Sequence, residues 1–133
     1  MDVDVTIKDN SRDLAQKLDA RVPIILEACG LEGEKFAKKD ARVDTGRYRA
    51  SITHAVSGKG EEVHKYTDDK GTPFVEEIAA VPESERAVYI GTNVEYALPL
   101  EQLDHTIKNA VANHISEYKK IIQEGMSDVI GSK

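Results

Sequence analysis

The chain has 133 residues, 40% of them hydrophobic and 32% charged, which predicts one globular domain over residues 1–133 and excludes a disordered or fibrous protein. The longest apolar run is far below the ~20 residues that a membrane-spanning helix needs, and the single cysteine excludes an internal disulfide or a thiolate-rich zinc site. The net charge of −6 argues against tight nucleic-acid binding, because neutralisation of phosphates by Lys and Arg supplies most of that affinity.

A strand and a long helix are predicted for the first part of the chain. Asp2–Lys8 alternates polar and apolar residues, as in a half-buried strand. Residues at helical spacing predict a helix over Ser11–Asp40, with the cysteine buried in it: Leu14, Leu18, Val22, Ile25, Cys29 and Phe36. Pro23 should cause a kink, or begin the second of two consecutive helices. Gly30 and Gly33 should weaken the helix by ~1 kcal/mol each relative to Ala.

The middle of the chain is expected to hold short elements. Glu61–Arg86 has two alternatives, a β-hairpin or a mobile loop. With the hairpin, the predicted elements in chain order are a helical turn over Arg47–Ala50, a strand over Ile52–Val56, a turn at Gly58–Gly60, hairpin arms at Val63–Thr67 and Pro73–Val81, and a strand over Ala87–Gly91.

The last predicted element is one long helix that ends between Gly125 and Asp128. Its apolar stripe consists of Leu103, Ile107, Ala110, Val111, His114, Ile115, Tyr118, Ile121 and Ile122. His114 is therefore expected to be a hydrogen-bonded core or interface histidine. The order of elements has no regular βαβ alternation. It predicts an α+β fold, with an antiparallel sheet packed against a long N-terminal helix and a long C-terminal helix.

Two separated segments carry the most specific pattern. Residues 43–52 read Val-Asp-Thr-Gly-Arg-Tyr-Arg-Ala-Ser-Ile, and residues 88–97 read Val-Tyr-Ile-Gly-Thr-Asn-Val-Glu-Tyr-Ala. In this order and spacing they resemble the tail-completion, or head–tail joining, proteins of long-tailed DNA phages (the gene-product-ten family of lambdoid phages). The matching positions are Asp44, Thr45, Gly46, Arg47, Arg49, Ser51 and Ile52 in the first motif and Gly91, Thr92, Glu95, Tyr96, Ala97 and Glu101 in the second.

The resemblance implies a structural assembly protein of the virion rather than an enzyme. It implies a ring, expected to be hexameric, at the head-proximal end of the tail, which mediates head–tail joining. Its partners would be connector or adaptor proteins and tail-tube or terminator proteins, with DNA passing through the ring without specific binding. No cofactor or membrane is implied, and the protein would reside in the host bacterial cytoplasm during assembly. A neck adaptor or a tail-terminator or tube subunit is the alternative.

The Asp-Thr-Gly sequence is also the signature of aspartic proteases, so a homodimeric peptidase using Asp44 is a remote alternative. In such enzymes two aspartates share one proton within loops held by apolar strands. Here Asp44 follows a charged helix end, and Arg47 and Arg49 would disfavour the shared-proton state. We expect instead that Asp44 or Thr45 caps a helical turn, with Gly46 relaxing the backbone.

The other candidate residues predict no catalytic or metal site. Arg47 and Arg49 are expected to be solvated or paired with acids such as Glu95 or Glu101. Ser51 lacks the strand–turn–helix context of a nucleophile elbow. The histidines show no ligand spacing: His54, His64, His105 and His114.

Overall fold

The computed structural model describes residues 11–43, 46–94 and 96–130, and it confirms the α+β class. The predicted strand Asp2–Lys8 lies outside the described residues. The elements in chain order are α1 (Ser11–Asp40), α2 (Arg47–Ser51), β1 (Thr53–Val56), β2 (Glu62–Thr67), β3 (Pro73–Ile78), the 3₁₀ helix η1 (Glu83–Glu85), β4 (Val88–Gly91), α3 (Ala97–Asp104), α4 (Thr106–Ala112) and α5 (Ile115–Ile130).

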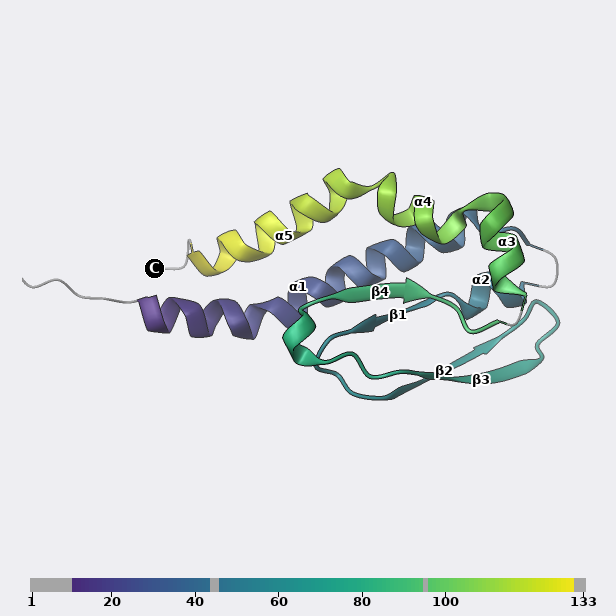
Figure 1. Cartoon of the computed structure of the whole chain (residues 1–133), viewed down its shortest axis with the longest axis horizontal. Coiled ribbons are helices and arrows are strands. Elements are labelled where there is room, and N and C mark those ends of the chain that lie inside the picture. The colour runs from purple at the N-terminus through teal and green to yellow at the C-terminus, as the bar shows by residue number, and fades with distance from the viewer. Residues whose placement is uncertain (1–10, 44–45, 95, 131–133) are drawn as a thin grey trace, which may run out of the picture.

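Helix α1 is the element around which the others are arranged (Figure 1). Helices α4 and α5 pack along one side of it, and strands β1 and β4 pack on another side. The β2–β3 hairpin lies beyond β1 and β4 and contacts α2. The long helix is therefore shared by the helical layer and the first strand layer.

The strands form two small antiparallel sheets rather than the single sheet that we predicted. Strand β1 pairs with β4, with Thr53 opposite Gly91 at one end and Val56 opposite Val88 at the other. Strand β2 pairs with β3 in the second sheet. The hairpin alternative for Glu61–Arg86 is thus confirmed, although its second arm ends at Ile78 rather than Val81.

The turn of this hairpin is stabilised by one acidic side chain. Asp68 Oδ1 accepts hydrogen bonds from the backbone N–H groups of Lys70 and Thr72, each at 2.9 Å. Gly71 supplies the positive φ of 83° that the turn requires. The Asp-Asp-Lys-Gly sequence therefore closes the hairpin by ordinary turn chemistry.

Helix α1 runs from Ser11 to Asp40 as one helix, so of the two alternatives for Pro23, a kink or two consecutive helices, the second is wrong. Pro23 has no N–H to donate to the preceding turn, but it is exposed, and water can satisfy the carbonyl that loses its partner. Helix propensity alone did not decide the outcome, because the turns after Pro23 pack against the rest of the protein through the buried Ile25 and Cys29.

Gly30 and Gly33 are the positions at which α1 approaches the β1–β4 sheet most closely. A Cβ atom at Gly30 would overlap the imidazole of His54, and one at Gly33 would overlap the Cδ1 atom of Ile90 and lie 3.0 Å from the hydroxyl of Tyr118. These glycines lower helix propensity, as the sequence predicted, but they allow the helix and the sheet to come into contact.

The C-terminal region consists of three helices rather than the single long helix that we predicted. The first break is at His105, which has a φ of 52° and donates its N–H to the carbonyl of Glu101 at 2.8 Å. The carboxylate of Glu101 accepts hydrogen bonds from the N–H groups of Ile107 (2.9 Å) and Lys108 (3.0 Å). Glu101 therefore ends α3 with its backbone and caps α4 with its side chain.

The second break, at Asn113 and His114, brings an aromatic ring onto α1. The imidazole of His114 stacks on Phe36 with 3.5 Å between ring centroids and an interplanar angle of 4°. His114 is half-buried, and its Nδ1 lies 3.5 Å from Glu117. The breaks divide the predicted stripe, leaving four of its members exposed: Leu103, Val111, Ile115 and Ile122.

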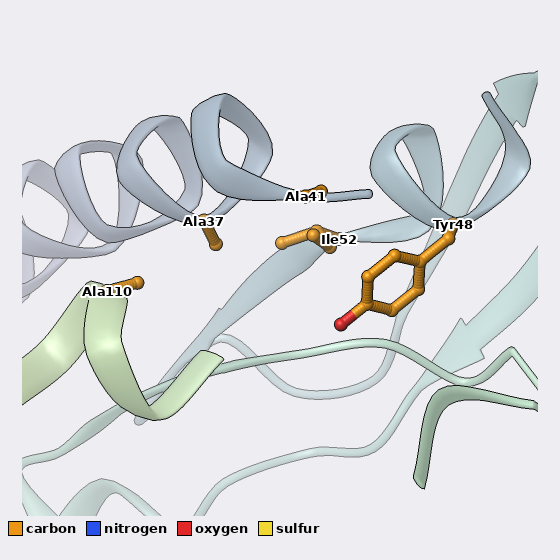
Figure 2. Close-up of a cluster of buried hydrophobic side chains, with 5 residues drawn as sticks. All are labelled: Ala37, Ala41, Tyr48, Ile52 and Ala110. Carbon is orange, nitrogen blue, oxygen red and sulfur yellow. The ribbon is translucent and has the colours of Figure 1, made fainter. Parts of the chain in front are cut away.

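The main hydrophobic cluster lies where α1, α2 and α4 meet (Figure 2). It is built from small residues around one large aliphatic side chain, the fully buried Ile52. The buried members are Ala37, Ala41, Tyr48, Ile52 and Ala110. Because three of the five members are alanines, the helices approach one another closely and the total volume of the buried side chains is small.

We expect Gly33→Ala to lower the free energy of unfolding by about 1–3 kcal/mol, because the added methyl group meets Ile90 on the sheet. At an open helix position the same change stabilises by about 0.5–1 kcal/mol. Ile90→Val removes the overlapping Cδ1 atom and should recover part of the loss in the double variant. Urea unfolding of the three variants measures this coupling, and strictly additive effects would contradict the close contact.

Candidate functional site

The two sequence motifs meet in the structure. The first motif ends in α2 and leads into β1, the second begins with β4, and these strands pair with Thr53 opposite Gly91. Ser51 lies two residues before Thr53 and Thr92 lies one residue after Gly91, and their hydroxyl groups are 2.5 Å apart. Segments that are far apart in the chain therefore form one junction.

A chain of hydrogen bonds runs through this junction. Ser51 Oγ donates to the carbonyl of Tyr48 at 2.6 Å, so the hydrogen between the two hydroxyls belongs to Thr92. Thr92 Oγ1 accepts in turn from the N–H of Val94 at 3.2 Å. Ser51 is buried, and each hydroxyl both donates and accepts. The arrangement satisfies buried polar groups and holds the two motifs together.

Gly46 begins α2 in a conformation that favours glycine. Its φ is 81°, and a Cβ atom there would overlap the carboxylate of Asp69 in the hairpin turn. Gly46 also accepts the first backbone hydrogen bond of the helix, from Ala50 at 2.9 Å. It occupies the N-cap position, and no side chain caps α2 there. Asp44 and Thr45 lie outside the described residues, so their predicted capping role stays a prediction.

Arg47 joins α2 to the hairpin and to the second motif. Its guanidinium lies 4.2 Å from the ring centroid of Phe74 and 6.0 Å from that of Tyr96. It also lies 4.0 Å from the carboxylate of Glu76 on β3. A guanidinium between aromatic faces and a carboxylate gains both cation–π and ionic attraction. The half-buried Arg47 therefore acts as a bridge between elements.

Tyr66 completes this aromatic and ionic group on the inner face of the hairpin. Its hydroxyl donates to Glu76 at 2.5 Å, and its ring stacks between those of His64 and Phe74. Burial, together with the hydrogen bond to Glu76, raises the pKa of Tyr66 to about 12, so the hydroxyl stays protonated at neutral pH. His64 Nε2 donates to the carbonyl of Ala50 at 3.0 Å, which ties the hairpin to α2.

Both arginines pair with acids, as the sequence predicted, and the partners that the structure describes lie in the hairpin. Arg49 lies 3.6 Å from Asp69 in the hairpin turn, and Arg47 pairs with Glu76 on β3. Asp69 and Glu76 both lie in Glu61–Arg86, the segment for which the sequence allowed either a hairpin or a loop. Glu101 instead caps α4, and Glu95 lies outside the described residues.

Tyr96 and Gly91 take supporting positions in the second motif. Tyr96 occupies the N-cap position of α3, is exposed and presents its ring towards Arg47. Gly91 ends β4 opposite Thr53, and a Cβ atom there would meet no other atom. Its position in the motif therefore has no steric explanation among the residues that the structure describes.

A second polar cluster, which the sequence analysis missed, lies between α1 and β1. The side chain of His54 is 12% exposed and sits between two carboxylates of α1. Its Nε2 is 2.8 Å from Glu27, and its Nδ1 is 3.2 Å from Glu34. Ionised carboxylates only accept, so both ring nitrogens donate and His54 carries a positive charge. In the sequence, this cluster could have been recognised from Glu27 and Glu34, two acids seven residues apart on a helix face that otherwise packs against the sheet.

The pKa values in this cluster move in the directions that favour the charged forms. Hydrogen bonding to Glu34, opposed by burial and aided by Glu27, raises the pKa of His54. Burial acts to raise the pKa of Glu27, but hydrogen bonds from Lys59 and His54 lower it overall. Glu34 has a lowered pKa for the same balance, with His54 and Lys38 as its cations.

The other candidate considered in the sequence analysis is the single cysteine, and a metal site was considered as well. Cys29 is buried as predicted, and burial raises the pKa of its thiol. Within residues 11–43, 46–94 and 96–130 there is no group of His, Cys, Asp and Glu side chains that could hold a metal ion. None of the helices in the described part of the chain is long and apolar enough to cross a bilayer.

Comparison with protein-family models, with curated proteins and with solved structures finds no match for this chain.

Ser51→Ala and Thr92→Val should each destabilise the protein by about 1–3 kcal/mol, because each leaves a buried hydroxyl without its partner. The double variant should lose less than the sum, with a coupling of at least about 0.5 kcal/mol. Ser84→Ala, at an exposed serine of η1, is the control and should change stability by less than about 0.5 kcal/mol. Additive losses at Ser51 and Thr92 would show that the hydroxyls do not interact.

Thermal stability should depend on pH through the His54 cluster. The contribution of protonated His54 is fully present below its ordinary pKa of 6.5 and is lost as the pH rises through the raised value of the folded protein. The contributions of Glu27 and Glu34 are present above 4.5 and are lost as the pH falls through their lowered values. Stability should therefore be greatest between these limits.

His54→Gln tests this assignment in melting curves recorded by circular dichroism across the pH range. The variant should lack the decline above pH 6.5 that we expect for the parent protein, since glutamine does not titrate. It should also be less stable at pH 6, because Glu27 and Glu34 lose their buried cation. The same decline in both proteins would assign the pH dependence to another group.

Proposed function

We propose that this chain is a structural subunit of a long-tailed phage that forms a ring at the head-proximal end of the tail and mediates head–tail joining. The observation that carries the proposal is the junction of the two motifs, in which Ser51 meets Thr92 and β1 pairs with β4. A resemblance confined to two short segments gains weight when both segments belong to one structural unit. As an assembly protein, the chain would act through association, in the host cytoplasm and then in the virion.

The chemistry of the motif residues supports a shape-holding role. Ser51 uses its hydroxyl within the fold, Arg47 bridges α2 and the hairpin, and Glu101 caps a helix. Gly46 is required by backbone geometry and by the nearby Asp69. These interactions turn Ser51, Arg47 and Glu101 into the fold, and neighbouring exposed side chains are therefore better placed for contacts with other subunits.

Exposed apolar side chains beside the junction are the candidate contacts. Leu98 and Leu103 on α3 are 67% and 72% exposed, and Val111 and Ile115 follow on α4 and α5. A shallow depression of about 490 Å³ is lined in part by Leu98 and by Thr92 of the second motif. A ring subunit needs two such complementary surfaces, repeated at every contact.

The proposal also accommodates the acidic composition. A net charge of −6 would let DNA pass through a ring without being retained, because backbone phosphates are held mainly by Lys and Arg. The same charge fits a neck adaptor or a tube subunit equally well. Copy number per particle separates these alternatives, since one ring contributes few copies and a tube contributes many.

Complementation of a phage in which this gene is disrupted tests the proposal. Electron microscopy of the disrupted phage should reveal filled heads beside unattached tails, and the parent chain should restore joined particles. Leu103→Asp should fold normally, because this side chain is 72% exposed, but should reduce infectious titre by at least about tenfold, as a charge in a contact costs about 1.4 kcal/mol or more. Leu31→Asp on α1, 54% exposed, is the matched control and should complement.

The other outcomes are decisive as well. Abnormal tail lengths in the disrupted phage would move the protein to tail termination. Intact, infectious virions without the protein would refute the joining role. A peptidase activity of the purified chain that Asp44→Asn abolishes would replace the proposal with the aspartic-peptidase alternative.

A further inference from the structure

A cavity of about 330 Å³ lies between the β1–β4 sheet and the β2–β3 hairpin, on the side of the sheet that faces away from α1 (Figure 1). Both strand layers contribute to its lining, with Ala55 and Tyr89 from the sheet and His64 and Ile78 from the hairpin. Pockets that bind small molecules have volumes of about 300–1,000 Å³, a mostly apolar lining and a few polar groups that orient the ligand. This cavity therefore has the size and the composition of a binding site.

The wall formed by the β1–β4 sheet is kept open by a glycine. His54 and Ile90 face α1, and side chains alternate along a strand, so the adjacent Ala55, Tyr89 and Gly91 point the other way and line the cavity. A Cβ atom at Gly91 would meet no other atom, and its φ is not positive. The fold therefore has room for a side chain at Gly91, and the glycine leaves that room to the cavity.

Three polar side chains gather on the wall opposite. His64 is directly across from Glu76 in the β2–β3 pair, and the side chains of such a pair start about 4.5–5.5 Å apart. Asn93 donates from Nδ2 to the backbone carbonyl of Glu77, the residue after Glu76, at 2.7 Å. His64, Glu76 and Asn93 all line the cavity, so they form one polar end of it.

The hydrogen bonds within the fold leave only acceptors free on these three side chains. Nε2 of His64 donates to a backbone carbonyl, so Nδ1 of the neutral ring keeps its lone pair. Oε1 of Glu76 accepts from Tyr66, which leaves Oε2, and the use of Nδ2 by Asn93 leaves its Oδ1. Among the residues that the structure describes, none donates to any of these three atoms.

We propose that the cavity binds a primary alkylammonium group, which is carried by a lysine side chain or by a free aliphatic amine. A site whose free polar atoms are all acceptors requires a ligand that only donates. An ammonium has three donors and no acceptor, which matches three acceptor atoms, whereas a guanidinium has five donors. Ala55, Ile78 and Val81 supply apolar surface for the alkyl chain. The inference does not depend on the role proposed in the phage particle.

The charge around the cavity favours the same ligand. Between Glu61 and Glu85 the chain has eight acidic residues and only two lysines. Glu76 is the acid in the cavity lining, and its side chain is only 15% exposed. Arg47 approaches Glu76 at Oε1, the oxygen that Tyr66 also uses, so Oε2 remains for a further cation. Attraction between a cation and a half-buried carboxylate is stronger than it would be in water.

Titration of the ¹⁵N-labelled protein with pentylammonium chloride, followed by NMR, tests the site. The amide signals of Ile78, Gly91 and Asn93 should shift together, with a dissociation constant of about 1 mM for six non-hydrogen atoms. Glu76→Gln removes the charge but keeps an oxygen for Tyr66, and it should weaken binding at least about tenfold. Glu77→Gln removes the same charge from the outer face of the hairpin and is the matched control.

Gly91→Val separates binding from folding. The added side chain enters the cavity, so it should weaken binding of pentylammonium at least about tenfold. It meets no other atom of the described residues, so the midpoint of urea unfolding should stay close to that of the parent protein. If this variant does not fold, the comparison of Glu76→Gln with Glu77→Gln still decides the question.

Three further ligands define what the cavity recognises. 1-Pentanol has the same alkyl chain without the charge, and methylammonium has the charge without the chain, so both should bind at least about tenfold more weakly. Nα-acetyl-lysine N-methylamide identifies the source of the group. Binding at least as tight as that of pentylammonium points to a lysine of a partner protein, and weaker binding points to a free amine.

Two results would overturn the proposal. Equal affinity for methylammonium and pentylammonium would mean that the amine is attracted by surface acids alone. Unchanged affinity in Glu76→Gln, or an equal loss in Glu77→Gln, would mean that the cavity does not hold the ammonium.

Discussion

The close approach of α1 to the β1–β4 sheet is the constraint on which the other contacts depend. Gly30 and Gly33 remove side chains at the contact, and His54 fills the space left beside Gly30. Burying this imidazole is favourable only because Glu27 and Glu34 accept from both of its nitrogens. Helices α4 and α5 also pack on α1, and Tyr118 of α5 lies next to the same Gly33 as Ile90 of the sheet. The steric requirement for glycine and the ionic pairing of His54 thus apply at the same contact between α1 and the sheet.

The motif junction extends this arrangement to the hairpin. Ser51 and Thr92 join the ends of β1 and β4, and Arg47 carries the connection outward to Phe74 and Glu76. The hairpin has little hydrophobic core of its own, because a two-stranded sheet buries only one face. Its position therefore depends on aromatic stacking, on a guanidinium and on hydrogen bonds to α2, all of which are directional and less tolerant of substitution than apolar packing.

Local patterns predicted much of the fold, and the misses have identifiable causes. Helical spacing located α1, alternation located β1 and a short apolar run located β4, because each pattern lies within one element. The breaks at His105 and Asn113–His114 were missed because the periodicity of apolar residues continues through them. They depend on the capping carboxylate of Glu101 and on a stacked pair with Phe36, which is distant in sequence. The partners of Arg47 and Arg49 were missed for the same reason, since they lie across the fold.

The motif residues and the exposed apolar residues of this chain differ in what their side chains do. The described motif side chains, with the exception of the exposed Tyr96 and Arg49, direct most of their polar atoms into the fold. Their substitution would change association indirectly, by moving α2 or α3. Leu98 and Leu103 have the opposite character, because they contribute little to the core and leave apolar area exposed. The two motifs therefore contain residues that set the shape of this fold, whereas the apolar surface open to contact comes from exposed side chains after the second motif.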